Sequence, residues 1–249
     1  MTYSAQFIVL HTIKYTESSL LIYAYTDLFG RQTYILRGVR NTKSHGAAAH
    51  FFPLHILDAE VYHKKGALIQ HIKEFHSKNP LYSIRTDLYK SVIALFMGEA
   101  LYKTIKEEEP NAVLYQFLID AIMELDALSN GVANYHLYFI TRLCARLGYA
   151  PNNNYHPEYT PIFDIPQGSF VPMSAASDLT FLSESSALLC QLCKAPNASA
   201  AANIPLNGTQ RGLFIEAIIH YLSYHLNTPL ELKSPRVLKQ VMEGQDKSA

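Results

Sequence analysis

The sequence predicts an α+β multidomain protein, with a small five-stranded β-barrel at the N-terminus and an all-helical domain after it. Three observations predict this. Short β-rich runs separated by turns fill residues 1–80, a 3.6-residue apolar period begins after Asn79-Pro80, and the formal charge changes sign at the same point. With 249 residues, 49% hydrophobic and 17% charged, the chain can bury a core in one or two domains.

The first 80 residues contain five candidate strands, at 6–13, 19–26, 31–37, 54–62 and 67–74. Gly30 closes a turn before the third strand, and His63-Lys64-Lys65-Gly66 closes a hairpin between the last two. In the third strand Thr33, Ile35 and Arg37 face one way, and Gln32, Tyr34 and Leu36 face the other. Five short strands with such turns match the size of an OB-fold barrel, and an SH3-like barrel fits nearly as well.

Residues 81–249 show helical periodicity, so we expect domains at 1–80 and 81–249. The expected helices are 88–102, 111–125, 134–147, 177–194, 209–226 and one that follows Ser234-Pro235. Gly148 and Pro151 end the third of these helices, and Ser177 or Asp178 caps the fourth. Residues 149–176, rich in Pro, Asn and Tyr, predict a folded irregular insert.

The formal net charge of zero conceals an uneven distribution. Residues 1–80 hold nine Lys and Arg against five Asp and Glu, a net charge of +4, and residues 81–249 have a net charge of −4. Such asymmetry indicates nucleic-acid contact by the basic part, whereas a balanced total excludes a polycationic DNA coat.

Known catalytic motifs are missing from the sequence. It has no phosphate-binding G-x-x-x-x-G-K-[ST], no G-x-G-x-x-G, no H-E-x-x-H, no G-x-S-x-G and no S-x-x-K. The acidic run Glu107-Glu108-Glu109 is typical of a solvated helix end. We therefore expect a protein that is not an enzyme and needs no cofactor.

Histidine and cysteine patterns do not predict a metal site. His45, His50 and His55 recur every five residues, a step that regular structure does not bring to one face, although a loop can. Cys190 and Cys193 form a single C-x-x-C within a helical pattern, where buried free thiols are the simplest interpretation.

Localisation follows from what the sequence lacks. Three cysteines are too few for a disulfide framework and favour a reducing compartment. We find neither a targeting segment nor an apolar run long enough for a bilayer, and expect a cytoplasmic protein with no membrane partner.

Three segments together resemble the RecO family of recombination mediators. The first is Tyr15-Thr-Glu-Ser-Ser-Leu-Leu-Ile-Tyr, followed by Tyr25-Thr-Asp-Leu-Phe-Gly-Arg and Leu36-Arg-Gly-Val-Arg-Asn-Thr-Lys-Ser. The second is Phe139-Ile-Thr-Arg-Leu-Cys-Ala-Arg-Leu-Gly-Tyr-Ala-Pro. The third begins Tyr221-Leu and continues through Pro-Leu-Glu-Leu-Lys-Ser-Pro-Arg-Val-Leu238. Together the three segments span residues 1–240, and their order and spacing carry the resemblance.

The chain departs from the family at one point. Many members carry a four-cysteine zinc site just after the Leu-Gly-x-x-Pro segment, but residues 152–158 contain no cysteine. Cys190 and Cys193 come too late in the sequence to replace it, so we do not carry the zinc over. We expect the Tyr/Pro-rich insert to pack through aromatic side chains instead.

The resemblance implies a non-enzymatic role in DNA repair, DNA recombination and the SOS response to DNA damage, in the nucleoid-associated cytoplasm. It implies binding of single- and double-stranded DNA, strand annealing, and association with RecR and with the acidic C-terminal tail of single-stranded DNA-binding protein, so that RecA is loaded. A generic OB-fold single-stranded DNA- or RNA-binding module without mediator activity is the alternative. An uncharacterised hydrolase is a further one, disfavoured by the missing motifs.

Candidate site residues follow from the expected hairpin ends and loops. Basic side chains there would neutralise phosphates, and aromatic rings would stack on unpaired bases. The DNA-binding candidates are Arg31, Arg37, Arg40, Lys43, Lys64, Lys65 and Tyr34. Any one of these basic side chains can also be an ordinary solvated residue, and Tyr34 can belong to the core. For the acidic tail we expect Arg142 and Arg146, four apart on one helix, or else a role for them at the edge of the core.

Overall fold

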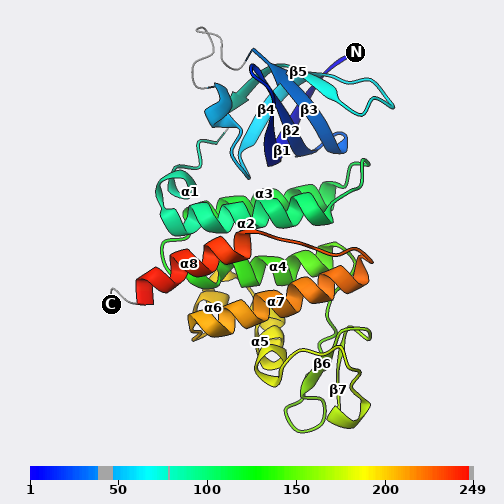
Figure 1. Ribbon diagram of the computed structural model, residues 1–249, viewed down its shortest axis with the longest axis vertical. Coiled ribbons are helices and arrows are strands. Elements are labelled where there is room, and N and C mark those ends of the chain that lie inside the picture. The colour runs from blue at the N-terminus through cyan, green and yellow to red at the C-terminus, as the bar shows by residue number, and fades with distance from the viewer. Residues whose placement is uncertain (39–46, 78, 247–249) are drawn as a thin grey trace. The chain divides into compact units, whose positions relative to one another are not determined.

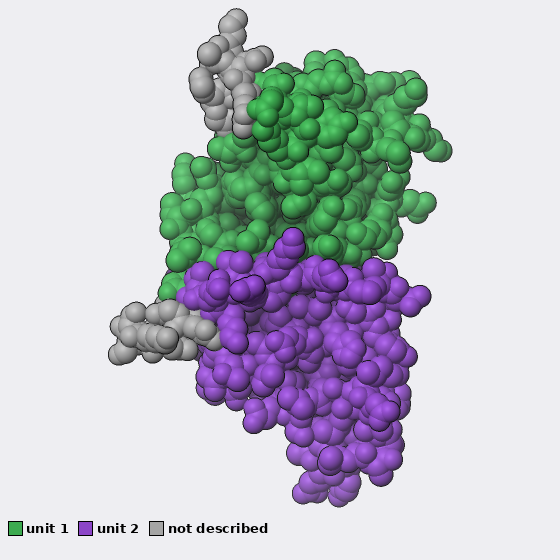
Figure 2. Space-filling model, viewed as in Figure 1, with its two compact units in different colours: residues 1–127 green, residues 128–249 purple. Residues whose placement is uncertain are grey.

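The computed structural model describes residues 1–38, 47–77 and 79–246 (Figure 1). Its chain divides into two compact units, residues 1–127 and residues 128–249, which Figure 2 distinguishes by colour. The first unit contains the β-rich segment together with three helices, and the second contains helices and a short hairpin.

A closed barrel fills the N-terminal part of the first unit. Its strands are β1 (Thr2–Thr16), β2 (Ser19–Thr26), β3 (Gly30–Arg37), β4 (Ile56–Tyr62) and β5 (Gln70–Ser77). Their order is β1-β2-β3-β5-β4, and the barrel closes because β1 pairs with both β2 and β4. The long β1 can serve two partners because it has 15 residues and bulges after Val9 and Lys14. With β3 parallel to β5, this is the OB-fold arrangement, so the prediction of an OB-fold is confirmed.

Alternation along each strand builds the barrel core. Phe7, Ile22 and Tyr34 are fully buried and pack with Leu57 and Val61 from β4. The predicted alternation of β3 is confirmed, because Tyr34 and Leu36 belong to this core cluster and Arg37 is exposed. The turn before β3 places Gly30 at φ 60°, the left-handed conformation that the sequence suggested.

Three helices complete the first unit: α1 (Tyr82–Thr86), α2 (Leu88–Thr104) and α3 (Ala112–Ala127). Asp87 caps α2 by accepting the backbone N–H groups of Tyr89 and Lys90. The Lys90 side chain is buried, and its Nζ donates to Ser83 Oγ and to the carbonyl of Asp126, both at 2.7 Å. One ammonium group therefore ties the three helices together.

The second unit is mostly helical. It contains α4 (Tyr135–Arg146), α5 (Ser183–Lys194), α6 (Ala198–Ala202), α7 (Gly208–His225), α8 (Ser234–Asp246) and the hairpin β6 (Ile162–Asp164) and β7 (Ser169–Val171). Single 3₁₀ turns are η2 (Ala47–His50) in the first unit, and η3 (Val132–Asn134) and η4 (Met173–Ala175) in the second. Asn207 and Gln210 form a capping box at the start of α7. The buried amide of Asn134 donates to the carbonyls of Ala201 and Ile204, which anchors the end of α6.

The expected start of the fourth helix is wrong. It begins at Ser183 rather than at Ser177 or Asp178. The segment before it pairs with β6 instead: Ser177 N–H donates to Asp164 Oδ2, and Phe181 N–H donates to the carbonyl of Phe163. The expected irregular insert therefore contains a small hairpin, and the short helices α1 and α6 were not anticipated from the periodicity.

Aromatic rings hold the insert, as expected. Phe163 makes edge contacts with Phe170, Phe181 and Tyr221, with ring centroids 5.0–5.4 Å apart. Asn154 bridges to Phe170 in both directions, since its amide donates to the carbonyl and its oxygen accepts the N–H.

Candidate nucleic-acid interface

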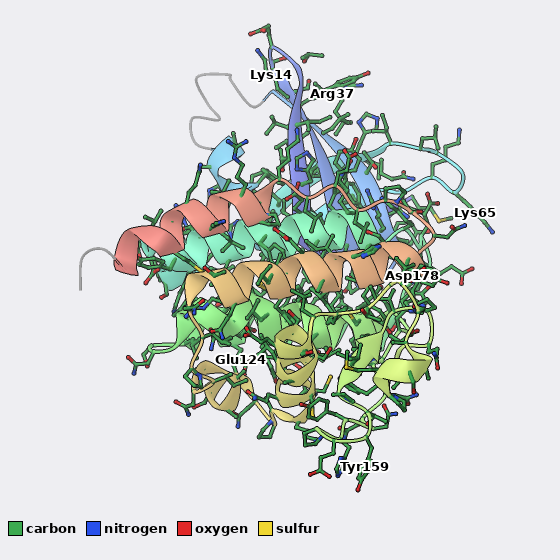
Figure 3. The ribbon with its side chains drawn as sticks, turned by 60° about the horizontal axis from the view of Figure 1, so that its bottom comes forward. Lys14, Arg37, Lys65, Glu124, Tyr159 and Asp178 are labelled. Carbon is green, nitrogen blue, oxygen red and sulfur yellow. The ribbon has the colours of Figure 1, made fainter. Side chains whose placement is uncertain are left out.

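Exposed lysine and arginine side chains cluster at two places on the barrel. The first is the end where β1 turns into β2 and where β3 ends. Arg37 lies beside Ser19 in the β2–β3 pairing, and Ser19 pairs with Thr16 of β1. Lys14 and Arg37 lie at the same end of the barrel in Figure 3, and the adjacent Tyr15 is 56% exposed. We call Lys14, Tyr15 and Arg37 the β1–β2 end.

The second place is the β4–β5 loop, residues 63–69. Buried Gln70 braces it, because its side chain accepts the N–H of Lys64 and donates to the carbonyls of Lys64 and Ala67. Both Lys64 and Lys65 are thereby left exposed at the tip, where Figure 3 shows Lys65 pointing outward. Tyr62, half exposed, precedes the loop.

These two places flank the face of the barrel formed by β2 and β3. The His63 ring stacks flat on Phe29 at a centroid distance of 3.9 Å, so the loop lies at the start of β3. Arg37 is at the other end of that strand, about 23 Å away along extended backbone. OB-folds bind oligonucleotides on the strand 2–3 face between the β1–β2 and β4–β5 loops, so both places lie where a ligand is expected.

Arg31 has a different environment from the other basic candidates. Its Nη1 donates to the carbonyl of Tyr102 at 2.7 Å and to that of Ile105, at the C-terminal end of α2. Burial lowers the pKa of its guanidinium. The charge therefore satisfies orphan carbonyls and the negative end of the α2 dipole, which is a structural role.

Gly30 explains why the α2–α3 turn can approach the barrel. A Cβ built there would lie 2.4 Å from the carbonyl oxygen of Glu109. The next residue, Arg31, donates its backbone N–H to the carbonyl of Glu107 at 2.9 Å. The acidic run is thus held by its backbone against the start of β3.

Tyr34 is fully buried, stacked on Phe7 at 5.4 Å, and its ring offers no face to a base. The aromatic residues that can stack are Tyr15 and Tyr62, which the sequence analysis missed. Each is within two residues of an exposed lysine, which is a pattern visible in the sequence. Arg40 and Lys43 lie outside the described residues.

The histidine series does not form a metal site in the described chain. His45 is outside the described residues, and the rings of His50 and His55 are 5.9 Å apart. His55 is buried with its Nδ1 on the carbonyl of His50 and its Nε2 on Ser77 Oγ, and burial lowers its pKa. Across the described residues, no group of three or more His, Cys, Asp or Glu side chains has a metal-binding arrangement.

In the second unit, Arg142 caps a helix. Its Nη2 donates to the carbonyl of Ala195 at the end of α5, and its guanidinium lies over Tyr138. Arg146, one turn further along α4, is exposed. The two arginines therefore do not act as one cationic pair in this structure.

A groove of about 640 Å³ lies between α7 and α8. Its apolar lining includes Ile215, Ile219, Leu230, Leu238 and Met242. The charged residues along it are Arg211, Arg236, Lys239, Glu216 and Glu231. Sequence reasoning missed it because a groove depends on how two helices pack, although Leu238 and Met242 show the i, i+4 spacing of an apolar helix face.

The zinc site that the resemblance implies for other family members has no counterpart within the described residues. Cys144 and Cys190 are buried in α4 and α5, so the prediction of buried free thiols holds for both, while Cys193 is half-buried and also free. Burial raises the pKa of Cys193 to about 11, whereas a zinc ligand must be a thiolate. At the insert, Asn154 and Asp164 bind backbone groups instead, so these residues do not fit the metal. No helix within the described residues has the length and hydropathy of a membrane span.

The barrel and its basic flanks define an OB-fold nucleic-acid-binding protein. Family models refine this class: "Recombination protein O N terminal" matches residues 1–80, and "Recombination protein O C terminal" matches residues 85–234. The chain therefore belongs to the RecO family, whose role is DNA repair and recombination.

Named relatives agree over nearly the full length. DNA repair protein RecO of Flavobacterium psychrophilum is 34% identical over 94% of this chain and 96% of its own. The Bacteroides fragilis protein of the same name is 33% identical over 95% and 97%, and that of Azobacteroides pseudotrichonymphae is 28% identical over 98% and 100%.

Proposed function

We propose that this protein binds single- and double-stranded DNA and anneals complementary strands without catalysing a chemical step. The observation that carries the proposal is the presence of exposed basic side chains beside an exposed tyrosine at both ends of the β2–β3 face: Arg37 lies beside Tyr15 and Lys14, which pairs with Glu17 at 2.6 Å, and Lys64 and Lys65 lie beside Tyr62. Membership of a DNA repair family supports it.

Annealing needs no nucleophile. Two phosphate backbones repel each other, and a surface that neutralises phosphates lowers that repulsion so that base pairing can follow. Stacking on tyrosine keeps bases unpaired and accessible until a complementary strand arrives. The absence of known catalytic motifs in the sequence is consistent with this kind of activity.

The test is the rate at which fluorophore- and quencher-labelled complementary strands pair in the presence of the protein. We expect faster pairing with the natural chain and slower pairing with the double variant Arg37→Glu, Lys65→Glu. Lys194→Glu, which reverses an exposed charge on α5, is the matched control and should behave like the natural chain. No acceleration by the natural chain would contradict the proposal.

Mediator activity is the finer part of the proposal. We infer that the α7–α8 groove takes the acidic C-terminal tail of single-stranded DNA-binding protein, and that RecR association and nucleoid localisation accompany RecA loading. An apolar groove with cations at its rim fits a short peptide that ends in apolar residues and carries carboxylates. Arg236 and Lys239 are exposed on α8 next to Leu238, so they can meet the acidic part while Ile219 and Leu230 meet the apolar part.

A fluorescent tail peptide tests this site. We expect Arg236→Glu with Lys239→Glu to weaken peptide binding about tenfold or more, since two favourable contacts become repulsive. Lys194→Glu on α5 is the matched control. Arg146→Glu tests the sequence-based candidate, and weaker peptide binding by that variant alone would place the tail at α4.

The alternative is a generic OB-fold module that binds single strands and has no mediator partners. A pull-down with RecR and the tail peptide separates the two. Annealing without capture of either partner would favour the generic module.

A further inference from the structure

A recess of about 430 Å³ lies in the first unit, lined by residues of the segment before β4 and of α1 and α2, with no residue of β2 or β3 in its lining. Ile84 and Ala94 form its floor, both buried, and Phe52, Pro53 and Leu95 form its walls. Its volume lies within the range of pockets that bind small organic groups. Leu95 is 40% exposed at its rim, so apolar surface faces solvent there.

Among the described residues that line this recess, Arg85 is the cation. Arg85, exposed at the end of α1, places its guanidinium carbon 5.6 Å from the centre of the Phe52 ring. Within the described residues, no hydrogen bond or ion pair to the guanidinium accompanies this contact. Its donors are therefore available to an anionic group beside an aromatic, apolar recess.

The walls of the recess are fixed. The Phe52 ring stacks on the His55 ring, with centroids 4.4 Å apart. Gly98 of α2 leaves room for Pro53, because a Cβ at that position would lie 3.0 Å from the proline Cβ. The recess is thus formed before any ligand arrives, which lowers the entropic cost of binding.

The segment that carries Phe52 is hydrogen-bonded to β1, the strand that leads to the β1–β2 end. Thr12 of β1 donates its hydroxyl to the carbonyl of Phe51 at 3.0 Å, and the N–H of Leu54 donates to the carbonyl of Val9. The segment that carries Phe52 is therefore attached to β1 two residues before Lys14, which begins the β1–β2 end. A strand held at Lys14 can reach the recess within a few nucleotides.

We propose that this recess binds one unpaired nucleobase of a single strand, with Arg85 pairing with the phosphate of the same nucleotide. The inference rests on the proposed DNA binding and names a contact outside the β2–β3 face. A nucleobase has the flat apolar faces that the recess accepts. The phosphate of the same nucleotide supplies an anionic partner for the Arg85 guanidinium. An acidic peptide would need more than one cation along its length, as the α7–α8 groove provides.

The test compares an oligothymidylate strand with an abasic deoxyribose-phosphate strand of the same length. Leu95→Ala removes an apolar wall, and we expect about threefold weaker binding of the oligothymidylate with no change for the abasic strand. Arg85→Gln removes a phosphate contact, so it should weaken both strands and lower the slope of log K against log salt by about one. The matched controls are Val113→Ala, at an exposed position of α3, and Lys194→Gln, at an exposed position of α5.

The outcomes separate the two proposals. If the natural chain binds neither strand, the proposed function itself fails. If it binds oligothymidylate but Leu95→Ala and Arg85→Gln match their controls, the nucleobase site is wrong and the DNA-binding proposal stands. Equal weakening of both strands by Leu95→Ala also overturns the base contact. So does a result in which Leu95→Ala and Arg85→Gln keep their DNA affinity but no longer bind a glutamate-rich peptide that ends in Phe.

Discussion

The guanidinium of Arg31 lies 4.6 Å from the centre of the Tyr102 ring, and its Nη1 donates to the carbonyl of the same residue at 2.7 Å. The two residues are 71 positions apart, and their contact joins the start of β3 to the end of α2. A basic residue that the sequence offers to DNA is thereby used to attach a helix to the barrel.

Replacing Arg31 should therefore affect stability. We expect Arg31→Ala to lower the free energy of unfolding by about 1.5–3 kcal/mol, because it removes the charged donor of the buried Ile105 carbonyl and leaves the Tyr102 carbonyl with Lys106 Nζ alone, 3.2 Å away. The measurement is urea unfolding followed by circular dichroism. Lys194→Ala, which removes an exposed cation at the end of α5, is the control. If Arg31→Ala keeps its stability and loses DNA affinity, the residue belongs to the interface after all.

Arg37 and Lys65 should behave in the opposite way. Both are exposed, so Arg37→Glu and Lys65→Glu should leave the free energy of unfolding within about 0.5 kcal/mol of the natural value. Each should weaken DNA binding and reduce the salt slope by about one, measured by fluorescence anisotropy at several salt concentrations. An unchanged affinity and slope in both variants would remove these residues from the interface.

Aromatic substitutions test which tyrosines meet DNA. Tyr62→Ala should weaken single-strand binding about fivefold or more, with little loss of stability, because the ring is half exposed. Tyr34→Phe should leave DNA binding unchanged and should leave the free energy of unfolding unchanged or slightly higher. The reason is that the buried Tyr34 hydroxyl has no hydrogen-bond partner among the described residues. Weaker DNA binding by Tyr34→Phe would contradict the assignment of Tyr34 to the core.

The sequence was sufficient where neighbouring residues determine structure. Alternation of Tyr34 and Leu36 with Arg37 established the faces of β3, and Gly30 marked its turn, so the barrel could be predicted. The fate of Arg31 could not, because it depends on where a helix 71 residues later ends. Nor could the start of α5, because Asp164 draws Ser177 into pairing with β6.

Charge illustrates the same limit. Counted to residue 80, the N-terminal part has a net charge of +4, but the compact unit extends to Ala127. Over residues 1–127 there are 13 Lys and Arg and 13 Asp and Glu, because α1–α3 and their turns carry eight acids. The unit that contains the barrel has no net formal charge. DNA binding must therefore rely on local groups of lysine and arginine side chains rather than on the electrostatic field of a net positive charge.

The Asp164 carboxylate should stabilise the insert through its hydrogen bonds to backbone N–H groups, without a metal ion. Burial acts to raise the pKa of its carboxyl, but the N–H groups of Ser177 and Gln167 outweigh burial and hold the pKa below its ordinary value. Its stabilisation is therefore present at neutral pH and is lost as the pH falls through the folded-state pKa, below about 3.9. We expect Asp164→Ala to lower the free energy of unfolding by about 2–3 kcal/mol at neutral pH.

A chelator gives the complementary measurement. If Asp164 and Asn154 hold the insert, added EDTA should leave the melting temperature of the natural chain unchanged, whereas a structural zinc would make it fall. Asp178→Ala, which alters an exposed carboxylate nearby, is the matched control for Asp164→Ala. A chelator-induced drop in melting temperature would show that a metal contributes.

His136 sets the expected pH dependence of the second unit. Burial, with Arg211 as a smaller cause, lowers the pKa of His136 to about 3, whereas an unfolded histidine titrates near about 6.5. As the pH falls below about 6.5, the unfolded chain takes up a proton that the folded chain does not, so stability decreases progressively toward pH 3. His136→Gln should flatten this part of the profile of unfolding free energy against pH, and His156→Gln, an exposed histidine of the insert, should leave it unchanged. The same acid-side slope in His136→Gln and the natural chain would mean that another group controls it.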